Sequence, residues 1–276
     1  MSETIPAPAV RVSCLARRDE ATAPGSRVIP EETPIAFTYG GATHAVMMAT
    51  PSDLEDFAVG FAITEGLIDA DAPALDVEIA ASELGIELRS WLPGESQGQY
   101  AARRRSMAGP TGCGLCGIES LEQATRVLPA LESAVRVRAS ALVEAMDRLP
   151  GSQKLNQQTR AMHAAAFWNP ATDALILRED VGRHNALDKL AGALARQGTP
   201  GSSGVVLMTS RVSVELVQKA ARIGAAVIAA VSAPTALAVR TAEACGMTLV
   251  AVMRGREFEI FTHPARIVEQ ASAHVA

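Results

Sequence analysis

Strands and helices alternate in the second half of the chain, and this alternation limits the possible folds more than any other feature of the sequence. Between residues 204 and 262 the expected order is strand, helix, strand, helix, strand, strand. Such an order is typical of a largely parallel sheet between layers of helices. We therefore predict an α/β domain over residues 136–276. Its strands are expected at residues 161–168, 174–178, 204–209, 226–231, 247–253 and 258–262, and its helices at 140–149, 183–196, 214–223 and 234–245.

The first half of the chain predicts a smaller α+β subdomain over residues 29–135. Two apolar runs meet at Gly40-Gly41, which is typical of a β-hairpin. Ser52 and Glu55 then have the spacing of a capping box and open a helical pattern. Two further strands are predicted at residues 76–80 and 86–92.

Residues 1–28 differ from both of these regions. They are rich in alanine, proline, serine and charge and show no sustained periodicity. We expect a flexible segment there with at most one short edge strand.

Composition narrows the range of functions. The net charge of −5 and the pI near 5.6 argue against nucleic-acid binding, which needs many cationic side chains on one face. The longest apolar stretch, residues 225–231, is far shorter than the roughly 20 residues that span a bilayer. Glu3 and nearby prolines occupy the place of a signal peptide's basic start and apolar run. We expect a soluble cytoplasmic protein with reduced cysteines and no membrane contact.

A Cys-x-x-Cys pair, Cys113 and Cys116, lies near the end of an aperiodic, mobile loop predicted at about residues 93–117. Two thiols at this spacing can be half of a metal site, a redox dithiol or a group-carrying thiolate. No other cysteine or histidine completes a zinc ligand set at the usual spacing, so we expect no protein-ligated metal. A redox motif belongs at a strand end near a βαβ unit, whereas this pair follows a long loop. The flanking glycines, Arg103–Arg105 and an expected helix at 118–128 favour a reactive thiolate, and all three uses remain open.

Polar residues also gather where predicted strands end. Residues 179–185 contain Asp180, Arg183, His184 and Asn185 at a strand-to-helix junction. Ser210-Arg211 follows the next strand, where helix N–H groups favour phosphate, so the two ends predict one anion-binding pocket. Asp180 also has the chemistry of a simple helix N-cap.

A third polar segment, Met253-Arg254-Gly255-Arg256-Glu257, forms the turn between the last two strands of the predicted sheet. This turn is either a hairpin with charged tips or a guanidinium clamp for phosphate.

Five ordered motifs together resemble the FdhD/NarQ family of formate dehydrogenase accessory sulfurtransferases, between Pro34 and Ile267. They are TGCGLCGIE, EDVGRHNALDKL, VELVQKAA, VSAPTALAV and RGREFEIFTHPARI. The resemblance implies a cytoplasmic, homodimeric sulfur carrier whose larger domain has a cytidine-deaminase-like fold without the zinc site. It implies that a cysteine desulfurase supplies sulfur as a persulfide. The sulfur then passes to the molybdenum cofactor, Mo-bis(molybdopterin guanine dinucleotide), before insertion into formate dehydrogenase, and a guanine nucleotide can mimic that cofactor.

The resemblance also implies roles for individual residues. Cys113 would carry the persulfide, with Cys116 as its helper. The cofactor site would include the turn residues Val252, Met253, Arg254, Gly255, Arg256 and Glu257, with Asp180, Arg183, His184, Asn185, Ser210 and Arg211 nearby.

Two segments depart from the family pattern. Residues 158–162 and Thr209-Ser210-Arg211 each lack a glycine that is usual there, so the shape of the pocket or the client preference is expected to differ. Two other functions compete with sulfur transfer: a cofactor-binding chaperone that transfers no sulfur, and a dithiol oxidoreductase.

Overall fold

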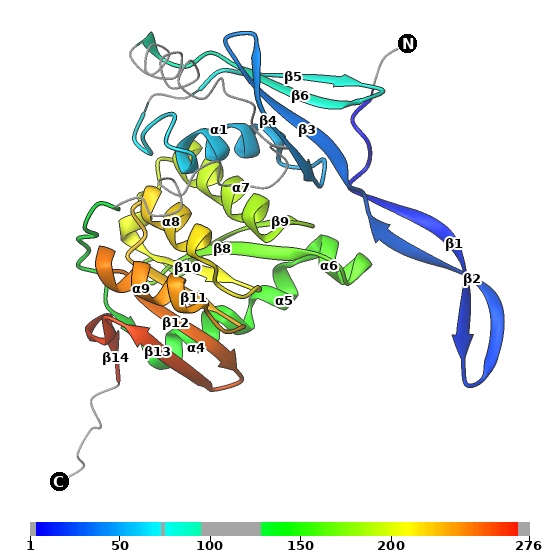
Figure 1. Ribbon diagram of the computed structural model, residues 1–276. Coiled ribbons are helices and arrows are strands. Elements are labelled where there is room, and N and C mark those ends of the chain that lie inside the picture. The colour runs from blue at the N-terminus through cyan, green and yellow to red at the C-terminus, as the bar shows by residue number, and fades with distance from the viewer. Residues whose placement is uncertain (1–3, 73–74, 95–127, 270–276) are drawn as a thin grey trace.

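The computed structural model describes residues 4–72, 75–94 and 128–269 (Figure 1). Its centre is a six-stranded sheet with the order β13-β12-β11-β10-β8-β9. The strands are β8 (His163–Asn169), β9 (Ala174–Asp180), β10 (Val205–Met208), β11 (Val227–Ala230), β12 (Thr248–Arg254) and β13 (Glu257–Thr262). The strand positions agree with the sequence prediction to within about two residues.

The sheet is mixed, which corrects the prediction of a largely parallel one. Only β10, β11 and β12 pair in parallel; β8 pairs antiparallel to both β10 and β9, and β13 pairs antiparallel to β12. Short turns connect β8 to β9 (residues 170–173) and β12 to β13 (residues 255–256). Connections this short reverse the chain and give antiparallel pairs, whereas two neighbouring parallel strands need a longer crossover connection.

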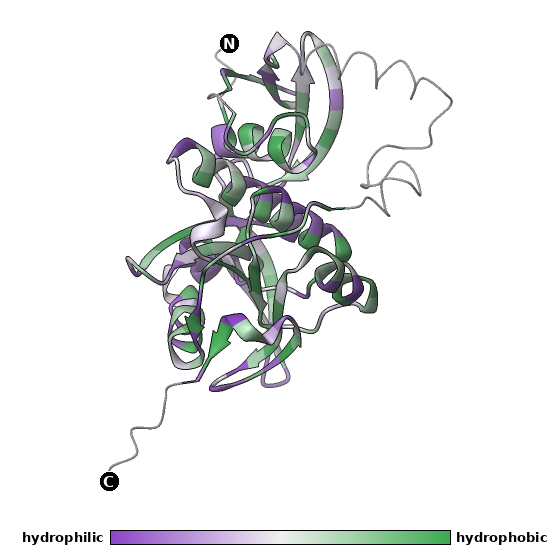
Figure 2. Cartoon of the chain, turned by 90° about the vertical axis from the view of Figure 1, so that its left-hand side faces the viewer, coloured by the Kyte–Doolittle hydropathy of each residue, from purple (hydrophilic) through white to green (hydrophobic). Residues whose placement is uncertain are grey.

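Helices cover both faces of this sheet, so the α/β class is confirmed. One face packs against α7 (Arg183–Arg196), α8 (Val214–Arg222) and α9 (Ala236–Cys245). The other face packs against α4 (Ala139–Asp147) and α5 (Leu149–Ser152), which the short α6 (Lys154–Thr159) follows. Alternation along β10 shows the division, because Val206 and Met208 face the first layer while Val205 and Leu207 face the second. The hydrophobic colour in Figure 2 follows these strands and helices through the interior.

The first half of the chain adds a four-stranded sheet with the order β4-β3-β6-β5. Its elements are β3 (Thr33–Tyr39), β4 (Ala42–Ala49), α1 (Leu54–Thr64), β5 (Val77–Ser82) and β6 (Gly85–Ser90). The hairpin predicted at Gly40-Gly41 is confirmed. Helix α1 lies between this sheet and α7, and the two helices touch at glycines, since a Cβ on Gly60 would lie only 1.7 Å from the Asp188 carbonyl oxygen. One continuous hydrophobic core therefore joins both halves of the chain.

The start of α1 differs from the predicted capping box. Asp53 precedes the helix in the left-handed conformation, with φ 51°, and makes no side-chain cap. Ser52 Oγ is buried without a hydrogen-bond partner among the described residues, and Glu55 pairs with Arg196 instead. The left-handed residue separates Ser52 from the first helical turn, which the spacing of Ser52 and Glu55 does not reveal.

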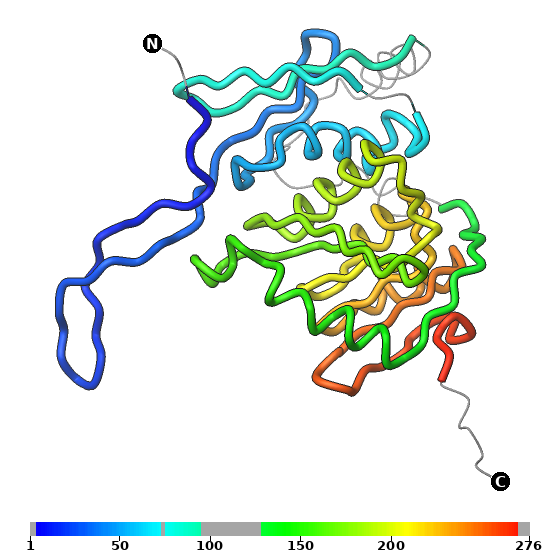
Figure 3. Tube along the Cα trace, turned by 180° about the vertical axis from the view of Figure 1, so that it is seen from behind, coloured from blue at the N-terminus to red at the C-terminus, as the bar shows by residue number. Residues whose placement is uncertain are grey.

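An N-terminal hairpin projects away from the rest of the molecule (Figures 1 and 3). Its strands are β1 (Ala9–Arg18) and β2 (Ala21–Pro30), and we call residues 9–30 the arm. The expectation of a flexible segment with at most one short strand is wrong here. Pro24 lies inside β2, and a strand that is an edge tolerates the missing N–H.

Small elements close the fold. The strands β7 (Val137–Arg138) and β14 (Ile267–Val268) pair in parallel, and the 3-10 turns η1 (Gly201–Ser203) and η2 (Pro264–Arg266) precede β10 and β14. Among the helices that the structure describes, none has the length and apolar character needed to cross a membrane.

Candidate functional site

One edge of the central sheet collects the site residues predicted on the α/β domain. β9, β10, β11 and β12 run in the same direction, so the residues that follow them emerge together. We call these loops the carboxyl rim. It consists of residues 180–185, 209–213, 231–235 and 252–257.

Backbone hydrogen bonds join these loops into one structure. The Val212 N–H donates to the Ala233 carbonyl at 3.4 Å, and the Val252 N–H donates to the Ser232 carbonyl at 3.4 Å. The 252–257 turn nevertheless lies four strand spacings from the end of β9, roughly 19 Å at about 4.8 Å per strand. The rim therefore carries two separate groups of predicted residues along one edge.

Asp180 is buried under the first group. Its carboxylate lies 2.7 Å from Lys189 Nζ, and both side chains are 0% exposed. It also accepts from the Thr50 N–H at 3.0 Å and from the Gly182 N–H at 2.8 Å. Gly182, not Asp180, is the N-cap of α7, so the N-cap interpretation is wrong.

Asn185 is buried beside Asp180. Its Nδ2 donates to the Met48 carbonyl at 2.9 Å and to Asp180 at 3.0 Å. The burial leaves Asp180 and Asn185 no surface for a ligand in this conformation. Both side chains instead fix the rim to the end of β4.

Arg183 and His184 occupy the first turn of α7 and are partly exposed. Arg183 Nε is buried without a hydrogen-bond partner among the described residues. The first turn of α7 contains no acidic residue, so its N-terminal N–H groups and the Arg183 guanidinium add positive potential at the same place. This end of α7 has the chemistry to hold an anion.

His184 connects α7 to α8. Its Nε2 lies 2.8 Å from Glu215 Oε2 and 3.2 Å from Ser213 Oγ. The hydrogen bond from His184 holds the pKa of Glu215 below its ordinary value. Glu215 also places an acidic side chain in the first turn of α8, so this helix end is a poorer phosphate site than the sequence predicts.

His163 lies beside this group at the start of β8, opposite Asp180 in the β8–β9 ladder. Burial lowers the pKa of His163, and the nearby Arg183 charge lowers it further. The neutral form of the His163 imidazole is therefore favoured. In this form the ring offers one acceptor nitrogen and one N–H donor beside Arg183 without adding a positive charge.

Ser210 and Arg211 complete the first group from the β10 side. Ser210 is buried and its Oγ donates to the Arg211 carbonyl at 3.0 Å, while the Arg211 side chain is exposed. Of the pair, only Arg211 presents its charge to solvent.

The second group is the β12–β13 turn. Arg254 lies opposite Glu257 in the β12–β13 backbone register, and both arginines of the turn, Arg254 and Arg256, are exposed. Met253 is buried in the core. Val252 has φ 56°, a left-handed conformation that is strained for a β-branched residue and coincides with a register shift in β12. Stored strain of this kind often accompanies ligand-binding backbone.

The predicted thiols lie outside the described residues. Residues 95–127 include Cys113, Cys116, Arg103–Arg105 and all of the segment predicted as a helix at 118–128 except Leu128. In the described ranges, no group of three or more histidine, cysteine, aspartate or glutamate side chains is arranged to hold a metal ion.

Sequence reasoning missed four contributors to the rim: Thr50, Lys189, Ser213 and Glu215. Thr50 and Lys189 carry no local signal, because their contacts with Asp180 are long-range or buried. Glu215 could have been found from its position in the first helical turn after the 209–211 segment.

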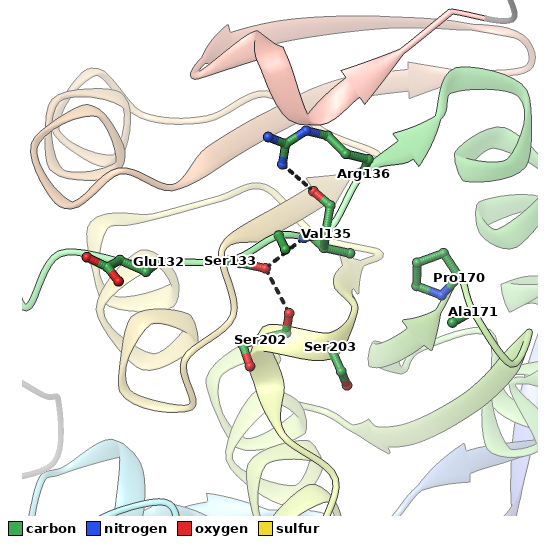
Figure 4. A pocket seen from close by; sticks show the side chains of 9 residues that line it. Glu132, Ser133, Val135, Arg136, Pro170, Ala171, Ser202 and Ser203 are labelled. Carbon is green, nitrogen blue, oxygen red and sulfur yellow. Dashed lines mark hydrogen bonds between the residues drawn. The ribbon is translucent and has the colours of Figure 1, made fainter.

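A cavity of about 560 Å³ opens at the opposite edge of the sheet (Figure 4). The turn residues Pro170 and Ala171 line it, and Ser133 Oγ donates to the Ser202 carbonyl at 2.8 Å. None of the predicted site residues takes part in its wall.

Known proteins similar to this chain were found at the level of the family, of individual relatives and of a solved structure. The model of the FdhD/NarQ family matches residues 30–268. A sulfur carrier protein FdhD from Agrobacterium fabrum is 52% identical over 94% of this chain and 96% of its own length. The protein of the same name from Brucella abortus is 51% identical over 92% of this chain and 95% of its own length. A solved structure from Desulfotalea psychrophila, assigned as a formate dehydrogenase accessory protein, superposes with a TM-score of 0.74, covers 95% of this chain and 100% of its own, and is 24% identical.

Proposed function

The chain belongs to the FdhD/NarQ family, and we propose that it is a sulfur carrier that serves formate dehydrogenase. The observation that carries this proposal is the identity of about half of all residues, over nearly the whole length, with relatives named sulfur carrier protein FdhD. We place the carrier in the cytoplasm.

Cys113 is the proposed carrier thiol. Its thiolate attacks the outer sulfur of a persulfide on a cysteine desulfurase, which forms an S–S bond on Cys113 and releases the desulfurase thiolate. Cys116 is the proposed resolving thiol. Its attack on the inner sulfur of the Cys113 persulfide forms a Cys113–Cys116 disulfide and releases hydrosulfide, and a cellular dithiol then reduces the disulfide.

The carboxyl rim is the proposed cargo site. The cargo, Mo-bis(molybdopterin guanine dinucleotide), is an elongated polyanion, and the rim offers cations at two places along one edge. Arg183 and the free N-terminus of α7 suit one phosphate group, and Arg254 with Arg256 suits another. Arg183 Nε supports this assignment, because it has no hydrogen-bond partner among the described residues, and a buried donor without a partner is costly unless a ligand satisfies it.

Sulfur loading tests the proposal directly. The protein is incubated with a cysteine desulfurase and cysteine, and intact-mass spectrometry is used to look for the gain of one sulfur atom. We expect the adduct on the wild type and on Cys14→Ala, a control in the exposed arm, and its loss in Cys113→Ala. Cys116→Ala should keep the adduct but transfer its sulfur more slowly.

An adduct on Cys113→Ala equal to that on the wild type would remove Cys113 from this role. Full formate dehydrogenase activity in cells that carry a Cys113→Ala/Cys116→Ala protein would instead indicate a chaperone that binds the cofactor without transferring sulfur. Steady reduction of insulin disulfides by the wild type would favour a dithiol oxidoreductase.

A further inference from the structure

No second layer packs on the arm in the part of the chain that the structure describes. β1 and β2 form ten residue pairs, from Ala9↔Pro30 to Arg18↔Ala21, and the hairpin extends away from the body (Figure 3). At about 3.3 Å per residue each strand is roughly 33 Å long. An isolated two-stranded hairpin is at best marginally stable in water, so an extended arm of this length needs a covering surface.

Within residues 4–72, 75–94 and 128–269, only the base of the arm is held by the body of the chain. β2 approaches α6, where the Arg27 guanidinium donates to the Thr159 carbonyl at 3.5 Å, and the Glu31 N–H donates to the Pro8 carbonyl at 3.0 Å. Beyond this base, the residues toward the turn at Asp19-Glu20 are largely exposed.

The two faces of the arm differ in polarity. Residues that are paired across an antiparallel ladder share a face, and alternate residues of a strand share it too. A Cβ on Gly25 would lie 3.7 Å from Ala16 Cβ and 3.8 Å from Cys14 Sγ, which places these three on the same side. We call this side the apolar face. It comprises Val10, Val12, Cys14, Ala16, Ala21, Ala23, Gly25 and Ile29, with Arg18 and Arg27 as its two charged members.

The opposite face is more polar. Half of it consists of Arg11, Ser13, Arg17, Thr22 and Ser26, and the other half of Ala9, Leu15, Pro24, Val28 and Pro30. An amphipathic hairpin with one apolar side is the pattern of a strand pair that covers another surface.

The charge of the arm indicates the kind of partner that it fits. Residues 9–30 contain four arginines (Arg11, Arg17, Arg18 and Arg27) and two acidic residues, so their net charge is +2. Because the whole chain carries −5, the remainder carries −7. A basic arm is therefore attracted to the body of another copy of the same chain.

We propose that the arm packs its apolar face on the body of a second copy of this chain, and that two copies exchange arms about a two-fold axis. Each arm supplies 22 residues. A stable interface of standard size uses roughly 20–30 residues from each side, so two exchanged arms and the surfaces they cover reach that size. The family resemblance implies a dimer without giving its interface, and the arm supplies that interface.

A matched pair of full-length variants tests the proposal. Val12→Glu/Ala16→Glu places two carboxylates on the apolar face, and Ser13→Glu/Ser26→Glu places two on the opposite face of the same strands. Mass in solution is measured by size-exclusion chromatography with light scattering over a dilution series. We expect a wild-type dimer, a dimer constant weakened about a hundredfold or more in Val12→Glu/Ala16→Glu, and at most a modest change in the control.

Three further readouts separate the explanations. Thermal unfolding of Val12→Glu/Ala16→Glu should show an intact core, since the arm lies outside it. Higher salt should weaken the wild-type dimer, because part of the attraction is between charges. The sulfur adduct on Cys113 should still form on the monomeric variant, so failure of the interface and failure of the sulfur-carrier function are distinguishable.

Either of two results overturns the proposal. One is a wild-type protein that stays monomeric at concentrations of tens of micromolar. This result overturns the proposal even if the arm of the monomer is found to bind formate dehydrogenase. The other is a dimer constant that Val12→Glu/Ala16→Glu leaves unchanged.

Discussion

Replacing Lys189 with methionine should destabilise the fold far more than the same change at an exposed lysine. Lys189 Nζ lies 2.7 Å from Asp180 Oδ2 and donates to the Thr50 carbonyl at 2.8 Å, inside a fully buried site. Methionine retains much of the side-chain volume but removes the charge and both hydrogen bonds. Asp180 is then left as a buried carboxylate without a cation.

The size of the loss in the free energy of unfolding depends on the hydrogen bonds that Asp180 keeps in Lys189→Met. Removing one partner of a buried ion pair typically costs about 3–5 kcal/mol. In Lys189→Met the carboxylate still accepts from the Thr50 N–H, the Gly182 N–H and Asn185 Nδ2. These donors favour the lower part of that range, and the orphaned Thr50 carbonyl adds about 1 kcal/mol. We expect a total loss of about 4 kcal/mol in the free energy of unfolding.

Urea unfolding at neutral pH, followed by far-UV circular dichroism, measures this loss. Lys154→Met is the matched control, since Lys154 is exposed on α6, and it should change the free energy of unfolding by no more than about 0.5 kcal/mol. The double variant Asp180→Asn/Lys189→Met leaves no charge buried alone, so it should cost less than Lys189→Met by itself. A cost below about 1 kcal/mol for Lys189→Met, or a double variant whose cost equals the sum of the two singles, would refute the reasoning.

Three other predictions concern the helix contact, pH and the rim. Gly60→Ala should cost about 1–3 kcal/mol or more, because its Cβ would lie 1.7 Å from the Asp188 carbonyl oxygen, whereas Gly151→Ala, with no atom within 4 Å, should be neutral or slightly stabilising; equal melting temperatures would contradict this. The lowered pKa of His163 means that the unfolded chain binds a proton more readily, so stability should fall as pH drops from about 6.5 toward the folded pKa, and His163→Asn should reduce that slope in urea unfolding at pH 5 and pH 7.5. Arg183→Ala should weaken binding of guanosine diphosphate about tenfold by calorimetry, while Arg240→Ala on the exposed side of α9 should not; equal affinities would move the anion site away from α7.

The sequence predicts the α/β domain well because its elements are locally encoded. Helix α7 was predicted at residues 183–196 and has those bounds, since apolar residues at helical spacing mark the buried side. The arm was missed because residues 1–28 are rich in alanine, proline, serine and charge and have no sustained period, although an isolated edge strand tolerates Pro24. The parallel sense of the sheet was overestimated because two short turns reverse the chain, and periodicity does not encode direction.

The sequence predicts where the rim residues lie in the fold, but not what the Asp180 side chain does there. Its residues do share one edge, as expected when polar segments follow strands that run in the same direction. Asp180, however, looked like a cap, since serine, threonine, aspartate and asparagine usually cap the helix they precede. Its actual partners are Lys189 and Thr50, and the second of these is 130 residues away in the sequence. Long-range pairing of this kind leaves no local pattern to detect.

Buried ion pairs tie the first half of the chain to the domain that carries the rim. Lys219 reaches Asp188 at 2.8 Å, and Asp188 accepts from Thr64 Oγ1 at the end of α1 at 2.6 Å. Burial raises the pKa of Asp188, whereas for Lys219 the neighbouring carboxylates of Asp188 and Glu65 outweigh burial and raise its pKa. The protonated lysine therefore persists and holds α1, α7 and α8 together.

The Asp180 network does the same at the rim itself. Thr50 donates its N–H to Asp180, accepts from Lys189 through its carbonyl and accepts the Val181 N–H through its hydroxyl. Displacing the Asp180 loop would break the two bonds that Asp180 and Val181 make with Thr50, together with the Asp180–Lys189 ion pair, so the rim is ordered before any ligand arrives. A pre-ordered rim lowers the entropy cost of binding a large anionic cargo. If the rim holds the cargo as proposed, the first half of the chain contributes to that binding through Thr50, although the proposed cargo contacts lie in the second half.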